Sequence, residues 1–157
     1  MNSKFCTYKR VGYLRRSIAE ELGIEFTGAI YACPGVLKHI IKRHGKQLDK
    51  NTKKNIFEFM KIILEDPDYI GIYKSDEGSV SIQFVKKIYN YLLLGVEVDE
   101  RNQYIYVSTM YPINYNKIKN RVDYGELIRV GCVWNIFIER NGIGLYNKLK
   151  KLLLNNL

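Results

Sequence analysis

The sequence predicts a single α+β domain, in which N-terminal helices pack on a twisted antiparallel sheet of about four strands and a further helix ends the chain. Apolar residues recur at helical spacing through the first 65 residues, and from about residue 69 they alternate as strands do. The chain has 157 residues, of which 46% are hydrophobic, so one domain, spanning residues 1–157, can form a sizeable core.

Three helices are predicted before the sheet. The first covers residues 11–22, where leucine and isoleucine recur every fourth residue and a glycine follows. The second covers residues 34–44, with a proline in its first turn and a glycine just after its end. The third covers residues 51–65, and a proline two residues later stops it.

The middle of the chain predicts an antiparallel meander. Its strands are rich in isoleucine, valine and tyrosine and are separated by short polar breaks. Lys86 continues the every-second-residue pattern of Ile82 and Phe84, and Thr109 and Tyr111 continue that of Val107. We therefore expect these three polar side chains on core-side faces near strand ends. The predicted strands cover residues 69–74, 79–87, 88–98 and 102–111.

The last 45 residues give weaker signals. Residues 113–122 predict a short helix or loop, and residues 129–138 contain a further candidate strand. Residues 144–155 predict a basic amphipathic helix with leucines on one side. Such a helix packs on its own domain in most proteins, although contact with nucleic acid or a membrane surface is the alternative.

Positive charge is concentrated in the N-terminal part. The formal net charge is +9, and residues 1–63 hold 13 Lys and Arg against 5 Asp and Glu, whereas residues 64–157 hold 12 against 11. A one-sided basic surface attracts phosphate backbones, so we expect RNA or an acidic protein as a partner. The alternative is a solvated basic face that serves only solubility.

Several function classes are not indicated. No apolar run is long enough to span a membrane, and the N-terminus lacks an apolar signal-peptide core, so the expected location is the cytoplasm, including that of a target cell that receives the chain as a toxin domain. The three cysteines, at positions 6, 33 and 132, predict free thiols and not a disulfide framework or zinc site. No cofactor is expected.

The only two histidines, His39 and His44, lie in the second predicted helix among several cations. Histidine exchanges protons near neutral pH, so the pair suggests acid and base chemistry on an anionic substrate. At 100° per residue the two side chains point about 140° apart, with His44 toward the buried stripe and His39 toward a polar side. This spacing disfavours a shared metal ion.

Cleavage of RNA by its own 2′-hydroxyl requires a base, an acid and a cation near the phosphate. His39 and His44 could supply the acid and base, and we expect both to be needed. Lys86, Thr109 and Tyr111 would complete the catalytic set if the His44 side of the helix packs on their strand faces. The candidate substrate-binding cations are Lys38, Lys42, Arg43 and Lys46.

Each of these residues also has a structural interpretation. His44 could be a core histidine, and His39 a surface residue. Lys86 could be an edge-strand lysine that prevents aggregation, and Thr109 and Tyr111 could be ordinary strand residues. Together these residues indicate a functional site more strongly than any one of them does alone, because they fall on compatible faces.

Four short motifs follow one another in a familiar order. They are the two histidines with their spacer at 39–44, Asp-Pro-Asp at 66–68, the strand end 84–86 and the strand end 107–111. Between residues 31 and about 120 the chain resembles the phage-associated branch of the barnase/EndoU/colicin/RelE-like (BECR) nuclease superfamily. The segments 1–30 and 129–157 would then be embellishments of this nuclease-like core.

The resemblance implies a site on the exposed face of a twisted antiparallel sheet and metal-independent cleavage of RNA, often tRNA, by toxins and phage-borne effectors. The family's helix histidine would correspond to His39 or His44, its strand-borne basic residue to Lys86, and its terminal-strand hydroxyl and aromatic positions to Thr109 and Tyr111. An acidic immunity or antitoxin protein is the implied partner.

Two functions remain open at this point. The first is a ribonuclease toxin or effector. The alternative is a non-catalytic basic module of a phage or mobile element, which binds nucleic acid or an acidic protein. In that case the 13 tyrosines could serve base stacking or a protein interface, although most are explained as strand residues.

Overall fold

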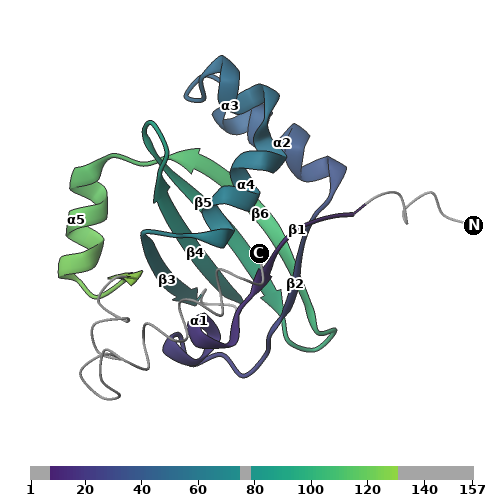
Figure 1. Cartoon of the computed structure of the whole chain (residues 1–157), viewed down its shortest axis with the longest axis vertical. Helices are drawn as coiled ribbons and strands as arrows, with labels where there is room; N and C mark the ends of the chain where they lie inside the picture. The colour runs from purple at the N-terminus through teal and green to yellow at the C-terminus, as the bar shows by residue number, and fades with distance from the viewer. Residues whose placement is uncertain (1–7, 75–78, 131–157) are drawn as a thin grey trace, which may run out of the picture.

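The computed structural model describes residues 8–74 and 79–130, and these form one seven-stranded sheet with five helices (Figure 1). In chain order the elements are β1 (Lys9–Leu14), α1 (Arg16–Glu21), β2 (Gly28–Ala32), α2 (Pro34–His44), α3 (Lys50–Lys54), α4 (Ile56–Glu65), β3 (Tyr69–Lys74), β4 (Val80–Lys87), β5 (Tyr91–Asp99), β6 (Tyr104–Pro112), α5 (Tyr115–Asp123) and β7 (Leu127–Arg129).

The strand order is β1-β2-β6-β5-β4-β3-β7. Neighbouring strands are antiparallel except β2 and β6, which run parallel through the pairs Ile30–Ile105 and Tyr31–Tyr106. The predicted α+β class is therefore right, but the predicted sheet of about four antiparallel strands is wrong. The meander forms its centre, and β1, β2 and β7 extend it on both sides.

The N-terminal segment was mistaken for a helix because a bulge disturbs its alternation. We predicted a helix over residues 11–22, but residues 9–14 form β1 and only Arg16–Glu21 is helical. The β1 register shifts between Arg10 and Gly12, so that Val11 and Leu14 both become buried. A spacing of three between buried residues is typical of a helix, which explains the error.

The strand β2 escaped prediction because three of its five residues are glycine or alanine. Such residues have low strand propensity, and the pairing with β1 and β6 overrides it. Its buried side chains, Ile30 and Ala32, belong to the main core.

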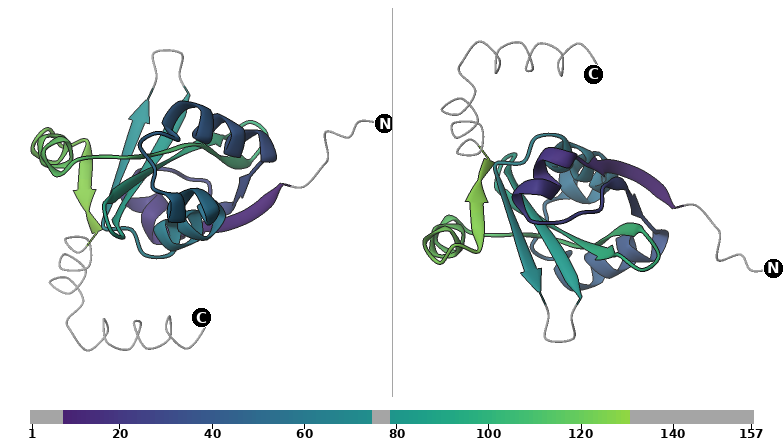
Figure 2. Two further views of the ribbon diagram at one scale, coloured as in Figure 1. Left: turned by 90° about the horizontal axis from the view of Figure 1, so that it is seen from above. Right: turned by 90° about the horizontal axis from the view of Figure 1, so that it is seen from below.

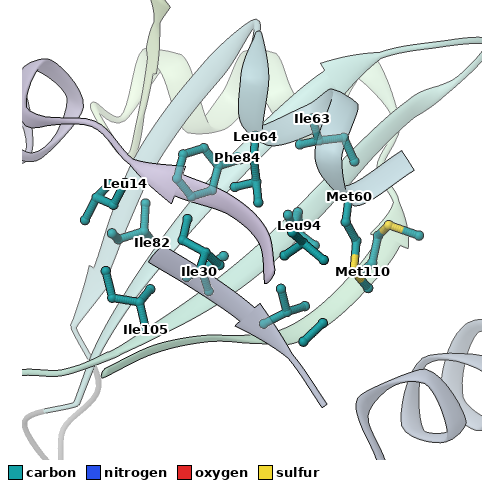
Figure 3. Packing of buried hydrophobic residues seen from close by; sticks show 14 of the residues in the cluster. Leu14, Ile30, Met60, Ile63, Leu64, Ile82, Phe84, Leu94, Ile105 and Met110 are labelled. Atoms are coloured by element: carbon teal, nitrogen blue, oxygen red, sulfur yellow. The ribbon is translucent and has the colours of Figure 1, made fainter. Parts of the chain in front are cut away.

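The main core lies between α4 and one face of the sheet (Figure 3). Met60 and Ile63 of α4 are fully buried together with Phe84 and Leu94 of the central strands. The helix approaches β1 closely at Gly12, where a Cβ atom would lie 2.7 Å from Cδ1 of Leu64. Gly12 thus allows α4 to pack closely on β1.

A smaller core lies on the other face of the central strands. Ile118 of α5 is fully buried there against a separate set of strand residues. In both views of Figure 2, α5 lies outside β7, on the far side of β3 and β4 from α4. The cluster contains Tyr69, Val85, Leu93, Ile113, Ile118 and Leu127.

The remaining elements agree largely with expectation. The helix predicted over residues 34–44 is confirmed as α2, and the helix predicted over 51–65 is divided into α3 and α4 at Asn55, whose backbone is not helical. The helix predicted at 144–155 and most of the strand predicted at 129–138 lie outside the described residues. Within the described ranges no helix has the length and apolarity that a membrane crossing requires. Cys33 is a half-buried free thiol there.

Candidate active site

The central strands present a polar face opposite the main core. Ile82, Phe84, Leu94 and Val96 point into the core, so their sequence neighbours on β4 and β5 point away from it. Toward residues 85 and 93 this second face is covered by α5. The part of this face that no described helix covers is called the open face and comprises Ser81, Gln83, Gly95, Glu97, Tyr104, Tyr106, Ser108 and Thr109, with Tyr31 on the neighbouring strand β2.

A bulge in β6 places two hydroxyl side chains over Gly95. The register runs from Gly95–Thr109 directly to Val96–Val107, so one residue of β6 is extra. A Cβ atom at Gly95 would lie 2.9 Å from Cγ2 of Thr109 and 3.2 Å from Oγ of Ser108. Both hydroxyl side chains therefore lie on the open face, and only a glycine fits beneath them.

The same bulge corrects the face predicted for Thr109 and Tyr111. We expected both on the core side with Val107, because strict alternation joins these positions. The extra residue shifts the alternation by one, so Met110 is fully buried in the main core. Thr109 and Tyr111 consequently point to the opposite face.

Glu97 is the carboxylate in the centre of the open face. Its partners across the strands are Ser81 on β4 and Tyr106 on β6. Partial burial raises the pKa of Glu97 above its ordinary value, while a hydrogen bond from the Ser81 hydroxyl works in the opposite direction. Burial, followed by the charges of Glu97 and Asp99, also raises the pKa of Tyr106. A carboxyl group with a raised pKa is suited to accept a proton near neutral pH.

Arg121 brings a cation from α5 to this face. Its Nη1 atom donates a 2.6 Å hydrogen bond to Oε1 of Gln83, and the contact is partly buried. Gln83 is paired across the sheet with Gly95, so the guanidinium group is held near the glycine. An arginine guanidinium offers several parallel donors, which suits a phosphate group.

His44 approaches the other end of the open face from α2. The strand β2 pairs with β6 for only two residues before the chain turns into α2, which then runs alongside β6. The ring centroid of His44 lies 5.1 Å from that of Tyr111. The side chain is half-buried, and among the described residues its Nδ1 atom has no hydrogen-bond partner. His44 thus contacts Tyr111, but on the face opposite the core side on which this packing was predicted.

These side chains surround one glycine, and we call the set the Gly95 site: Gln83, Glu97, Thr109, Arg121 and His44 with its neighbour Tyr111. Tyr111 pairs with Leu93, two residues before Gly95, and Glu97 lies two residues after it. Leu93 and Glu97 are about 13 Å apart along the strand. A phosphodiester above Gly95 would therefore have a carboxylate on one side and an imidazole on the other.

Most of the described residues match a known protein family. The family model described as phage-Barnase-EndoU-ColicinE5/D-RelE like nuclease 3 matches residues 9–120. The chain belongs to this nuclease family. No curated protein and no solved structure gives a significant match. The matched region includes β1 and β2, and the division into a core at 31–120 and two embellishments stays a prediction.

The structure places Lys86 of this family member away from the Gly95 site. Lys86 lies on the same strand face as Ile82 and Phe84, the main-core face, as predicted. Thr109 and Tyr111 lie on the other face. The Lys86 Nζ atom lies 2.6 Å from the carbonyl oxygen and 3.0 Å from Oδ2 of Asp66, and 4.0 Å from Oδ1 of Asp68. The expected meeting of Lys86 with Thr109 and Tyr111 is therefore wrong.

His39 is exposed on α2, five residues before His44. The other candidate binding residues are also exposed, and they give the nuclease a cationic rim beside His44. They are Lys38, Lys42 and Arg43 on α2 and Lys46 just after it.

Glu97 and Arg121 are not among the site residues predicted from the sequence. The signal for Glu97 was available, because it is the one carboxylate inside the apolar run 91–98 of the strongest predicted strand. Arg121 gave no such signal, since nothing in a short polar helix shows which residue will reach the sheet. Among residues 8–74 and 79–130, no three His, Cys, Asp or Glu side chains are grouped as a metal site would require.

Proposed function

We propose that this nuclease cleaves RNA at the Gly95 site, using the ribose 2′-hydroxyl as the nucleophile. The observation that carries the proposal is the position of Glu97. It is a partly buried carboxylate with a raised pKa at the centre of the open face, and Ser81 and Tyr106 flank it. Such a group is costly for folding and useful for proton transfer.

In the proposed reaction Glu97 accepts the proton of the 2′-hydroxyl, and the 2′-oxygen attacks the adjacent phosphorus. The bond from phosphorus to the 5′-oxygen breaks, and His44 donates a proton to that leaving oxygen. The products are a 2′,3′-cyclic phosphate and a 5′-hydroxyl end. This assignment uses the two proton-transfer groups that lie on opposite sides of Gly95.

The pentacoordinate phosphate carries extra negative charge, which a nearby cation stabilises. Arg121 reaches the strand position next to Gly95, because it donates a hydrogen bond to Gln83, which is paired with Gly95 across the sheet. Thr109 supplies a hydroxyl on the opposite side of the glycine, and Tyr111 holds the imidazole of His44. Each contact supports a positioned phosphate above the glycine.

The cations of α2 would attract the RNA backbone toward this site. Lys38, Lys42, Arg43 and Lys46 are exposed beside His44, and the charge balance of residues 1–63 adds to their field. We further propose that the chain acts as a toxin or effector in the cytoplasm, with tRNA as a target. An acidic immunity protein that covers the same cations is the corresponding partner.

The test is cleavage of purified tRNA and total RNA in excess EDTA. The wild type is compared with Glu97→Gln and with His44→Ala, after their melting temperatures have been measured. We expect discrete fragments with cyclic phosphate ends from the wild type alone. Intact RNA with the wild type, together with salt-sensitive binding, would instead support the non-catalytic module. Fragments that disappear with EDTA would overturn the metal-independent mechanism.

A further inference from the structure

The edge of the open face carries a row of tyrosine rings that the reaction above does not use. Tyr31 on β2 lies next to Tyr106 on β6, and both are on the open face because Ile30 and Ile105 point into the core. Tyr104 lies on the same face as Tyr106, two residues earlier. Tyr8, just before β1, contacts Tyr104 from the side.

The rings of this row are nearly parallel. Tyr31 and Tyr104 have centroids 6.0 Å apart at 17° between planes, and Tyr104 and Tyr106 have centroids 5.4 Å apart at 21°. Tyr8 meets Tyr104 edge-on, at 86° and 5.9 Å. A base could not enter between two of these rings, since a sandwiched ring needs about 7 Å, twice the contact distance of about 3.5 Å. A further aromatic ring would therefore stack on the outside of the row.

The row adjoins the Gly95 site directly, because Tyr106 is paired with Glu97 across the sheet. A hollow of about 370 Å³ opens beside Tyr106, and Glu97, Asp99 and Glu100 are among its lining residues. Acidic side chains repel phosphates but accept hydrogen bonds from the N–H groups of nucleobases. Aromatic faces and acceptors therefore suit the bases, whereas Arg121 and the α2 cations suit the backbone.

We infer that Tyr8, Tyr31, Tyr104 and Tyr106 form a stacking platform for unpaired nucleobases next to the cleaved phosphate. This inference rests on the proposed function and deepens it, because it names single-stranded RNA as the substrate class. Bases paired in a duplex keep their faces stacked on each other and cannot lie against these rings. Tyr104 is the half-buried central ring, and the exposed faces belong mainly to Tyr8 and Tyr106.

Binding of a non-cleavable strand separates this inference from catalysis. The probe is a fluorescent eight-nucleotide 2′-O-methyl RNA, which lacks the nucleophile, measured by anisotropy as a single strand and as a duplex. The variants are Tyr106→Leu and Tyr31→Leu, which remove a ring but keep apolar bulk. Tyr106→Phe keeps the ring, and Tyr89→Leu is the matched control, since Tyr89 is 74% exposed in the bend between β4 and β5.

We expect each leucine variant to weaken single-strand binding by about tenfold, with Tyr106→Phe and Tyr89→Leu near the wild type. Duplex binding should be weaker and unaffected by any of them. Unchanged single-strand binding by a leucine variant with a wild-type melting temperature would overturn the platform. Equal loss in Tyr106→Phe would also overturn it, because the ring would then not be the binding element.

Cleavage assays on the same proteins give the second readout. If the wild type cleaves RNA and the leucine variants bind normally, the platform fails and the proposed function stands. If the wild type cleaves no RNA but the leucine variants bind the probe less tightly, the proposed function fails and the platform stands. The two proposals therefore fail on different measurements.

Discussion

The ammonium group of Lys86 binds the end of α4 through Asp66. It donates to the backbone carbonyl oxygen of Asp66 at 2.6 Å and forms a 3.0 Å ion pair with the carboxylate of the same residue. Asp66 is the C-cap of α4, where the helix dipole favours a cation. Arg15 donates to the neighbouring carbonyl oxygen of Glu65, so two cations satisfy the end of this helix.

Replacement of Lys86 by alanine should therefore affect stability more than cleavage. We expect a loss of about 1–2 kcal/mol in the free energy of unfolding, because the helix end loses a charged hydrogen-bond donor. Cleavage below the melting temperature should stay close to the wild-type rate. Urea unfolding and a cleavage assay check this, with Lys54→Ala as the control for the lost charge. A large loss of cleavage at unchanged stability would restore Lys86 to the catalytic set.

The two histidines should differ in importance. His44→Ala should lower the cleavage rate at least about 100-fold, since proton transfer contributes that much or more. His39→Ala should leave the rate nearly unchanged, because His39 is exposed on the solvent side of the same helix. Single-turnover rates with saturating enzyme would compare the two. Equal losses would mean that both histidines act, as the sequence alone predicts.

Ionisation of Glu97 should determine how the cleavage rate depends on pH in the acidic range. As a base it must be ionised, so the rate should rise as the pH increases through its raised pKa. Glu97→Gln should lower the rate by about 100-fold or more and remove this limb of the profile. Rates between pH 4 and pH 8 provide the measurement. A persisting limb in the glutamine variant would assign the titration to another group.

The same variant should change the dependence of stability on pH. A raised pKa in the folded state means that folding favours the protonated form of Glu97, so its contribution to stability is present at low pH. This contribution is lost as the pH rises through the folded-state pKa. Glu97→Gln should thus melt at the wild-type temperature near pH 4 and above it near pH 7. Glu100→Gln is the exposed control, and an identical rise there would point to net charge as the cause.

The contribution of Arg121 to cleavage should depend on the shape of its guanidinium group as well as on its charge. Arg121→Ala should weaken cleavage by about 10- to 100-fold, and Arg121→Lys should recover only part of it, because an ammonium group cannot offer two parallel donors. The release of Gln83 costs little stability in either case. Measurement of kcat and KM separately would show whether the loss lies in the chemical step. Full recovery by lysine would indicate simple attraction of the phosphate.

The central strands and α2 could be predicted because their local patterns agree with their final environment. Residues 69–74 and 34–44 form the predicted elements with the predicted bounds. The sheet beyond the meander could not be predicted for two reasons. The bulge after Arg10 disturbs the alternation of β1, and β2 is held by its neighbours and not by its composition.

The candidate site was predictable only in part for a similar reason. His44 contacts Tyr111, as the packing of its helix side predicted, but Tyr111 lies on the face opposite the predicted one. Lys86 and Thr109 were expected together because each continues the alternation of its own strand. One extra residue in β6, opposite Gly95, moves Thr109 to the other face. The alternation of polar and apolar residues in the sequence does not indicate this extra residue.

The parallel pairing of β2 with β6 also orders events during synthesis. Residues 28–32 leave the ribosome long before residues 104–112, yet β2 can join the sheet only when β6 is available. Contacts so distant in sequence form slowly and late in folding. A nascent chain that ends before β6 contains Glu97 but lacks Thr109, Tyr106 and the strand on which α2 packs. The cell that produces this chain therefore encounters a complete Gly95 site only after β6 and Arg121 of α5 have been added.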